Sequence, residues 1–198
     1  MKQPNRHSIL LLTFILLLAG NVVAQRISFG LYATDNIVLT PLNSGTLNFN
    51  DKQSVILSGE TITINLADNA VAILTTEGRA DLDITVTIDA PTTLDLNVTN
   101  KIPLAIRFAY SNSGATTDIT ARATAIEVPS GFTSVTFPIK KRVSGLPAPP
   151  PTPSQTGYTG PTGTTYLFIY GTLGQVPVNV AAGNYTGNIN IHVEYSKY

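Results

Sequence analysis

Short runs in which apolar and polar residues alternate recur along most of this 198-residue chain, and they constrain its fold more than any other feature. The last run is the most regular, with an apolar residue at every second position: Ile189, Ile191, Val193 and Tyr195. Successive side chains of a β-strand point to opposite faces, so this pattern predicts a strand with one buried and one solvated face. The Gly- and Asn-rich turn before it carries Tyr185, which we expect to plug the core.

Similar runs predict strands elsewhere in the chain. They lie at residues 26–33, 37–40, 46–49, 54–57, 61–66, 70–75, 80–90, 94–98, 102–110 and 133–139, with three more within residues 165–195. We expect the run at 70–75 to end at Glu77-Gly78, and the run at 80–90 to form the central strand. Pro138 indicates that the run at 133–139 is an edge strand, because proline lacks the backbone donor that a central strand needs.

Residues 118–128 are harder to assign than the other segments. Their alanines would permit a helix, but Thr and Ile at short spacing favour a strand. No other segment has the pattern of an amphipathic helix. Many short strands separated by turn residues are typical of an all-β protein, and we predict an immunoglobulin-like or pilin-like antiparallel β-sandwich.

The N-terminus has the pattern of an export signal. Its first residues are basic, residues 9–18 are apolar, and Val22 and Ala24 offer small side chains for cleavage. The apolar stretch is shorter than the roughly 20 residues that span a membrane, and no second one follows. We predict a signal peptide at residues 1–24, with export to the periplasm, outer cell surface or extracellular space and no integral membrane segment after cleavage. The alternative is an uncleaved N-terminal anchor.

The remaining residues, 25–198, have a length that suits one domain. The chain contains no cysteine, so we expect no disulfide and no thiolate ligand or nucleophile. Residues 144–163 are rich in proline and glycine, which excludes a central strand there. We predict that they form a long loop between two strands of the same domain.

Charged residues are few and of mixed sign. The chain has 12 basic and 12 acidic side chains, and removal of the signal takes away two basic ones, Lys2 and Arg6. A protein that binds nucleic acid needs a basic patch or stripe, so we expect no nucleic-acid partner.

The C-terminal region has a characteristic order of glycines, valines and one tyrosine. It runs Gly171-x-x-Gly174, Val176-x-Val178-x-Val180, Ala182-Gly183-x-Tyr185-x-Gly187 and then the closing strand. This order resembles the end of pilin-like β-sandwich domains of exported bacterial proteins, among them spore-coat-protein-U-like proteins and a related domain family of unknown function. The segment Leu47-Asn48-Phe49-Asn50 is similar to an earlier Leu-x-Phe-Gly element of those families, with Asn50 in place of glycine.

The resemblance implies an exported, non-enzymatic structural or adhesive protein, a pilin-like subunit or extracellular interaction domain. Its partners would be further copies or other surface proteins, joined by β-strand addition. Residues 26–33 are the candidate donor strand, although we favour the simpler interpretation that they pair within their own domain. The resemblance departs from many pilins in the absence of cysteine and of a penultimate aromatic residue.

The sequence offers little for catalysis or metal binding. The one histidine after the signal, His192, lies on the polar face of its predicted strand, where a surface role is the simpler interpretation. Asp81, Asp83 and Asp89 share one face of another predicted strand and could serve as Ca²⁺ ligands or a glycosidase pair. A polar strand face needs such residues for solubility alone. We therefore predict no enzyme, no metal site and no cofactor.

Two groups of residues are candidates for an interaction surface. One consists of tyrosines in and after the Pro-rich loop: Tyr158, Tyr166 and Tyr170. The other is a basic run at the end of a strand: Lys140, Lys141 and Arg142. Tyrosines on a loop can stack on sugars, so a carbohydrate-binding module is the alternative function. Tyr166 and Tyr170 share a strand face with Phe168, however, which favours a place in the core.

Overall fold

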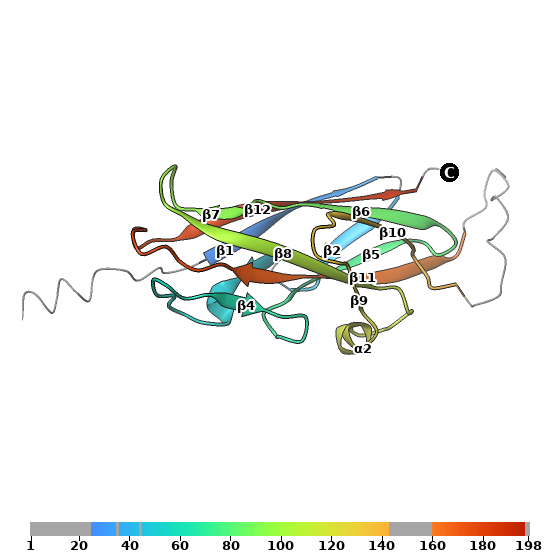
Figure 1. Cartoon of the computed structure of the whole chain (residues 1–198). Coiled ribbons are helices and arrows are strands. Elements are labelled where there is room, and N and C mark those ends of the chain that lie inside the picture. The colour runs from blue at the N-terminus through green and yellow to red at the C-terminus, as the bar shows by residue number, and fades with distance from the viewer. Residues whose placement is uncertain (1–24, 35, 44, 143–159, 197–198) are drawn as a thin grey trace, which may run out of the picture.

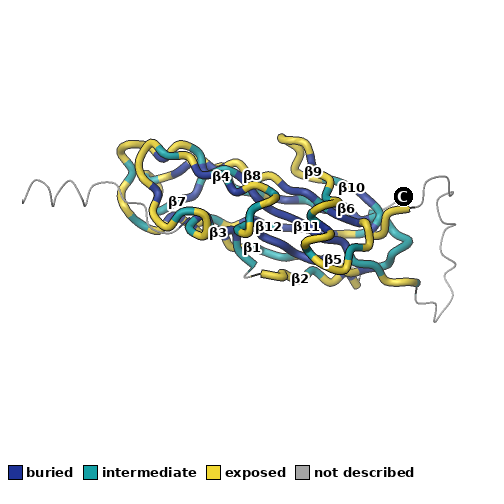
Figure 2. The backbone as a smooth tube through the Cα atoms, turned by 90° about the horizontal axis from the view of Figure 1, so that it is seen from below, coloured by how far each residue is buried: buried dark blue, intermediate teal, exposed yellow. Residues whose placement is uncertain are grey.

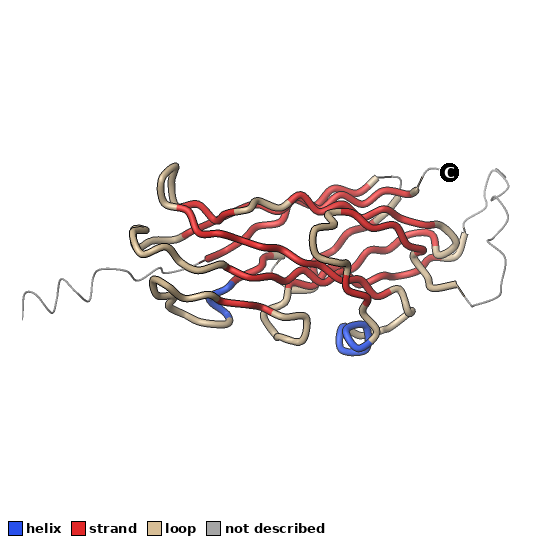
Figure 3. The backbone as a smooth tube through the Cα atoms, in the orientation of Figure 1, coloured by secondary structure: helices blue, strands red, loops and turns tan. Residues whose placement is uncertain are grey.

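The computed structural model describes residues 25–34, 36–43, 45–142 and 160–196. The predicted signal peptide, Tyr158 and most of the predicted Pro-rich loop lie outside these residues. Within them the protein is all-β, with one short α-helix and one turn of 3₁₀ helix (Figure 3).

The strands run lengthwise through an elongated molecule (Figure 1). They are β1 (Gln25–Ala33), β2 (Val38–Pro41), β3 (Thr46–Asn48), β4 (Ile62–Ile64), β5 (Ala72–Arg79), β6 (Asp83–Asp89), β7 (Thr93–Asp95), β8 (Lys101–Ser111), β9 (Ile126–Glu127), β10 (Ser134–Pro138), β11 (Thr162–Leu173) and β12 (Tyr185–Tyr195). The helices are η1 (Phe49–Asp51) and α2 (Asp118–Ala123).

The strands form two hydrogen-bonded groups that share β8. In the first group β12 is central, with β6 and β7 along one side and β1 along the other; β10 and β3 form its edges. In the second group β11 is central, with β5 and β4 along one side and β8 along the other; β2 and β9 form its edges. The first residues of β8 pair with β7, and the rest of the strand pairs with β11.

The core is built from the apolar positions of the alternating runs. Ile84, Ile189 and Ile191 are completely buried, as the pattern predicts. Figure 2 shows buried residues along the middle of the long strands and exposed ones mostly in the turns. Residues 165–171 of β11 are buried on both faces, so the preference for a core position of Tyr166 is confirmed.

The prediction of a wholly antiparallel arrangement is wrong at one pair. β1 runs parallel to β12 over its whole length, from Gln25 opposite Tyr185 to Ala33 opposite Val193. Its other side pairs with β3. Residues 26–33 therefore complete a sheet of their own chain, as the simpler interpretation expected.

Several predicted segments differ from the structure. Residues 118–123 are helical, because Thr117 caps the helix by accepting a hydrogen bond from the Thr120 amide. β5 continues through Glu77 and Gly78 to Arg79, since pairing with β11 extends that far. Residues 54–57 and 176–180 form no strand, and β6 begins only at Asp83. Edge position is confirmed for β10, which among the described strands pairs only with β6.

The glycines of the C-terminal pattern allow other elements to approach closely. A β-carbon on Gly171 would collide with the backbone of Ala105 in β8, and one on Gly187 would lie 2.9 Å from Leu94 Cδ2. Tyr185 is completely buried, and its hydroxyl donates a 2.8 Å hydrogen bond to the Ala181 carbonyl. The aromatic plug predicted at Tyr185 is confirmed, but Tyr185 is the first residue of β12 and not part of the preceding turn.

Candidate binding site beside the helix

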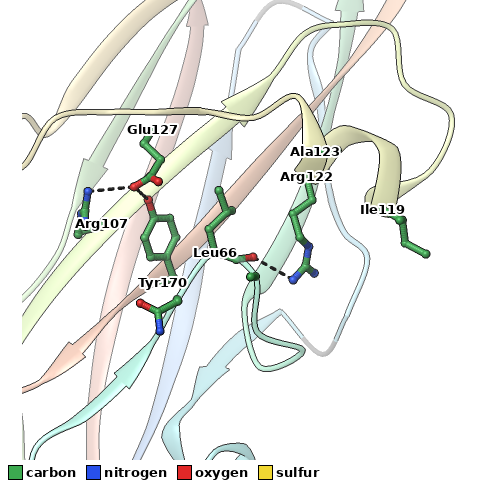
Figure 4. Close-up of a pocket in the computed structure, with 9 residues that line it drawn as sticks. Leu66, Arg107, Ile119, Arg122, Ala123, Glu127 and Tyr170 are labelled. Atoms are coloured by element: carbon green, nitrogen blue, oxygen red, sulfur yellow. Dashed lines mark hydrogen bonds and ion pairs between the residues drawn. The ribbon is translucent and has the colours of Figure 1, made fainter.

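A hollow of about 580 Å³ opens beside α2, and we call it the helix pocket. It is lined by residues of the β4–β5 loop, α2, β8, β9 and β11: Asn65, Leu66, Ala67, Arg107, Ile119, Arg122, Ala123, Glu127 and Tyr170. Four of these are apolar, and three carry a formal charge. Figure 4 shows how the charged side chains lie relative to Tyr170 and Leu66. Such a volume is within the usual range for small-molecule sites.

Arg122 fixes one wall of the helix pocket. Its Nη1 atom donates hydrogen bonds to the carbonyls of Leu66 and Asp68, at 2.9 and 2.7 Å. Its guanidinium carbon lies 5.9 Å from the centre of the buried Phe168 ring, in a cation–π arrangement. These contacts tie α2 to the β4–β5 loop and hold the charged group in place.

The opposite side of the helix pocket is formed by Glu127, Arg107 and Tyr170. One carboxylate oxygen of Glu127 accepts hydrogen bonds from Arg107 at 2.9 Å and from the Tyr170 hydroxyl at 2.7 Å. The Arg107 guanidinium also lies 5.7 Å from the centre of the Tyr170 ring. Both members of the ion pair are about half exposed, so its contribution to stability is small.

Tyr170 stays protonated at ordinary pH. Burial and the hydrogen bond to Glu127 both raise the pKa of its hydroxyl, because each disfavours the phenolate. The hydroxyl therefore acts as a donor to the carboxylate. Only 3% of Tyr170 is exposed, so its ring supports the pocket from below and offers no open face to a ligand.

The predicted tyrosine surface is not assembled in the described residues. Tyr166 and Tyr170 are both buried, and they are 7% and 3% exposed. Tyr158 lies outside the described residues. Of the three tyrosines, Tyr170 borders the helix pocket, through its side chain beneath Glu127.

The basic run lies at the end of the edge strand β10. Lys140, Lys141 and Arg142 are exposed, and Arg142 forms an ion pair with Asp83 at 2.5 Å. Asp81 pairs with Arg79 at 2.6 Å. The described residues contain no group of three His, Asp or Glu side chains arranged to hold a metal ion.

His192 is exposed on β12, as its place in the alternation predicted. Its ring stacks on Tyr32 of β1, with centroids 4.7 Å apart and planes 9° from parallel. The two rings border a shallow hollow of about 90 Å³, together with residues of β6 and β12: Thr85, Thr87, Val193 and Glu194. The parallel pairing of β1 and β12 places Tyr32 opposite His192.

Sequence reasoning missed the helix pocket and its main residues, Arg122 and Glu127. The available signal was the wholly aromatic face of β11, formed by Tyr166, Phe168 and Tyr170. An aromatic outer face must be covered by another part of the chain. The segment 118–128, which the sequence pattern left without a clear assignment, was the candidate to cover it.

No protein-family model matches the chain, and no curated protein matches it. Among the described residues, no helix is long and apolar enough to cross a membrane.

Proposed function

We propose that this is an exported, non-enzymatic interaction protein, a structural or adhesive subunit with an immunoglobulin-like, pilin-like β-sandwich. It acts in the periplasm, at the outer cell surface or outside the cell. The export pattern of residues 1–24 and the C-terminal glycine pattern support this proposal. The strands form two groups that share one hydrophobic core, and some strands that follow one another in the chain lie in different groups. Both features are compatible with a sandwich of this kind.

The observation that carries the proposal is a cluster of three loops at one end of the molecule. We call residues 55–60, 96–100 and 174–184 the loop end. Hydrogen bonds link these loops: the Ala181 amide donates to Asn100 Oδ1 at 2.8 Å, and the Gly59 amide to the Val176 carbonyl at 2.8 Å. Exposed apolar side chains on tied loops suit contact with another protein.

The loop end carries apolar side chains that are highly exposed. Val98 is 89% exposed and Val178 is 79% exposed. Val98 lies in a turn that Asn97 fixes by accepting hydrogen bonds from the amides of Thr99 and Asn100. In the described residues, by contrast, the five strands that pair on one side only are β2, β3, β4, β9 and β10, and they hold only two to five residues each, which leaves short templates for β-strand addition. Contact through the loop end is therefore the better-supported mode.

The proposal is tested by the oligomeric state of protein purified from the cells that export it, measured by light scattering and electron microscopy. We expect assemblies, or capture of a surface component, that the double variant Val98→Asp, Val178→Asp abolishes. Phe132→Asp is the matched control, since Phe132 is 66% exposed on the β9–β10 loop. A monomer that binds no cell-surface or matrix component would refute the proposal.

Carbohydrate binding is the second candidate, and the exposed Tyr32–His192 stack favours it. Tyr32 is 53% exposed, and its ring can stack on a sugar. On a glycan array, Tyr32→Ala should abolish binding and Tyr110→Phe should retain it. Equal binding by both variants would exclude this surface.

A further inference from the structure

We propose that the helix pocket binds the carboxylate of a small organic acid with a short aliphatic group beside its carboxyl, and that Arg122 is the residue that binds the anion. This site is independent of the proposed function, because contact through the loop end needs no ligand beside α2.

The first argument is the unused hydrogen-bonding edge of Arg122. A guanidinium has five N–H donors, and both donors on Nη1 are occupied by the carbonyls of Leu66 and Asp68. In the part of the chain that the structure describes, no hydrogen bond of Nε or Nη2 is formed. The Nε–Nη2 edge is the fork that binds a carboxylate through two parallel hydrogen bonds.

The second argument is charge. Arg107 and Glu127 lie together on one side of the pocket and neutralise each other at 2.9 Å. The carboxylate of Asp68, nearest to Arg122 along the β4–β5 loop, is paired with Lys52 at 2.7 Å instead. Within the described residues Arg122 has no ion-pair partner, so the lining of the helix pocket carries one uncompensated positive charge.

The third argument is rigidity. Two carbonyls and the buried Phe168 ring already hold the Arg122 guanidinium, so a ligand need not immobilise a flexible side chain. A long cationic side chain normally loses rotamer freedom when it binds, and a preorganised one avoids this cost. Arg122 is therefore better suited to bind an anion than an exposed, flexible lysine or arginine.

The apolar part of the lining determines the rest of the ligand. Leu66, Ala67, Ile119 and Ala123 border the pocket, and Ile119 is 75% exposed. An aliphatic group of three or four carbons on the ligand would cover this surface. A sugar acid fits less well, because Tyr170 is the only aromatic residue in the lining and its ring is buried.

The test uses N-acetyl-L-leucine, which combines a carboxylate with an isobutyl group, in an NMR titration of the ¹⁵N-labelled exported protein. We expect saturable shifts of the amides of Ile119, Arg122 and Ala123. N-acetyl-L-leucinamide, which lacks the carboxylate, should bind at least about tenfold more weakly, as the loss of a charge-assisted hydrogen-bond pair predicts. Equal affinity for the acid and the amide, or the absence of saturable shifts, would overturn the proposal.

Two sets of variants assign the site. Arg122→Gln should weaken binding of N-acetyl-L-leucine at least about tenfold, whereas Arg26→Gln, an equal charge change on exposed β1, should not. Because Arg122 also ties α2 to a loop, the pair Ile119→Glu and Ile119→Gln provides a test that leaves its contacts intact. The Ile119→Glu variant should bind N-acetyl-L-leucine more weakly, because its carboxylate repels that of the ligand, and the Ile119→Gln variant should bind it as before. Equal binding by these two variants, or a preference for glucuronate over N-acetyl-L-leucine, would refute the assignment. A protein that binds the acid but never assembles would contradict only the proposed function.

Discussion

Gly171 illustrates how one missing side-chain atom can determine the packing of two strands. Its backbone lies against the Ala105 carbonyl of β8, where a β-carbon has no space. Gly160 differs, since the three atoms nearest to a β-carbon there all belong to the side chain of Arg79, at 3.0 Å or more. Backbone atoms in a paired strand cannot move away, whereas a long side chain can adopt another rotamer.

We therefore expect Gly171→Ala to lower the free energy of unfolding by about 1–3 kcal/mol, the usual cost of overpacking. Gly160→Ala should leave that free energy within about 0.5 kcal/mol of the parent value, as surface substitutions do. Urea denaturation of both variants measures the difference. Equal midpoints would show that β8 and β11 can separate without loss.

At the scale of the element, β1 is held from both sides and contributes to the core. Ile27 is completely buried between β12 and β3, while its neighbour Ser28 is exposed. Ile27→Ala should lower the free energy of unfolding by about 2–5 kcal/mol, because it leaves a cavity. Ser28→Ala should change it by about 0.5 kcal/mol or less. If Ile27→Ala were as stable as Ser28→Ala in thermal unfolding, β1 would not be an integral strand of its own domain.

Most strands were predictable because alternation is a local property. β8 and β10 coincide with predicted runs to within about two residues, the usual uncertainty of such boundaries. β12 begins three residues before its predicted run, because Tyr185 to Gly187, expected in a turn, belong to the strand. The helix at residues 118–123 could not be predicted in this way. Its composition is balanced between helix and strand, and the Thr117 cap decides the outcome. The helix pocket was also beyond local reasoning, because Arg122 and Leu66 meet only when α2 folds over β11.

At the scale of the whole molecule, buried tyrosines set the response to alkaline pH. Burial raises the pKa of Tyr110, Tyr170 and Tyr185, most strongly for Tyr170. In the unfolded chain a tyrosine loses its proton near pH 10, so above that pH the folded protein binds more protons than the unfolded one. These tyrosines therefore do not change the free energy of unfolding below about pH 9 and lower it as the pH rises through 10 and 11.

Tyr170→Phe should reduce this decline, because one of the three protons that only the folded state retains is removed. Urea unfolding at intervals from pH 7 to pH 11 measures the effect. The two proteins should differ by a constant amount below about pH 9, which serves as the internal control, and converge above it. Parallel curves throughout would mean that Tyr170 ionises as easily in the folded protein as in the unfolded chain.

The sequence by itself determined that this chain is all-β, which residues of each strand face inward, and that Tyr185 plugs the core. These properties follow from the two-residue period of a strand and from local turn chemistry. Only the tertiary structure decided that β1 runs parallel to β12, that Tyr32 stacks on His192, and that Arg122 lines a pocket with one edge of its guanidinium unbonded among the described residues. Such contacts join residues far apart in the chain, and they depend on the order and direction of strands that alternation does not encode.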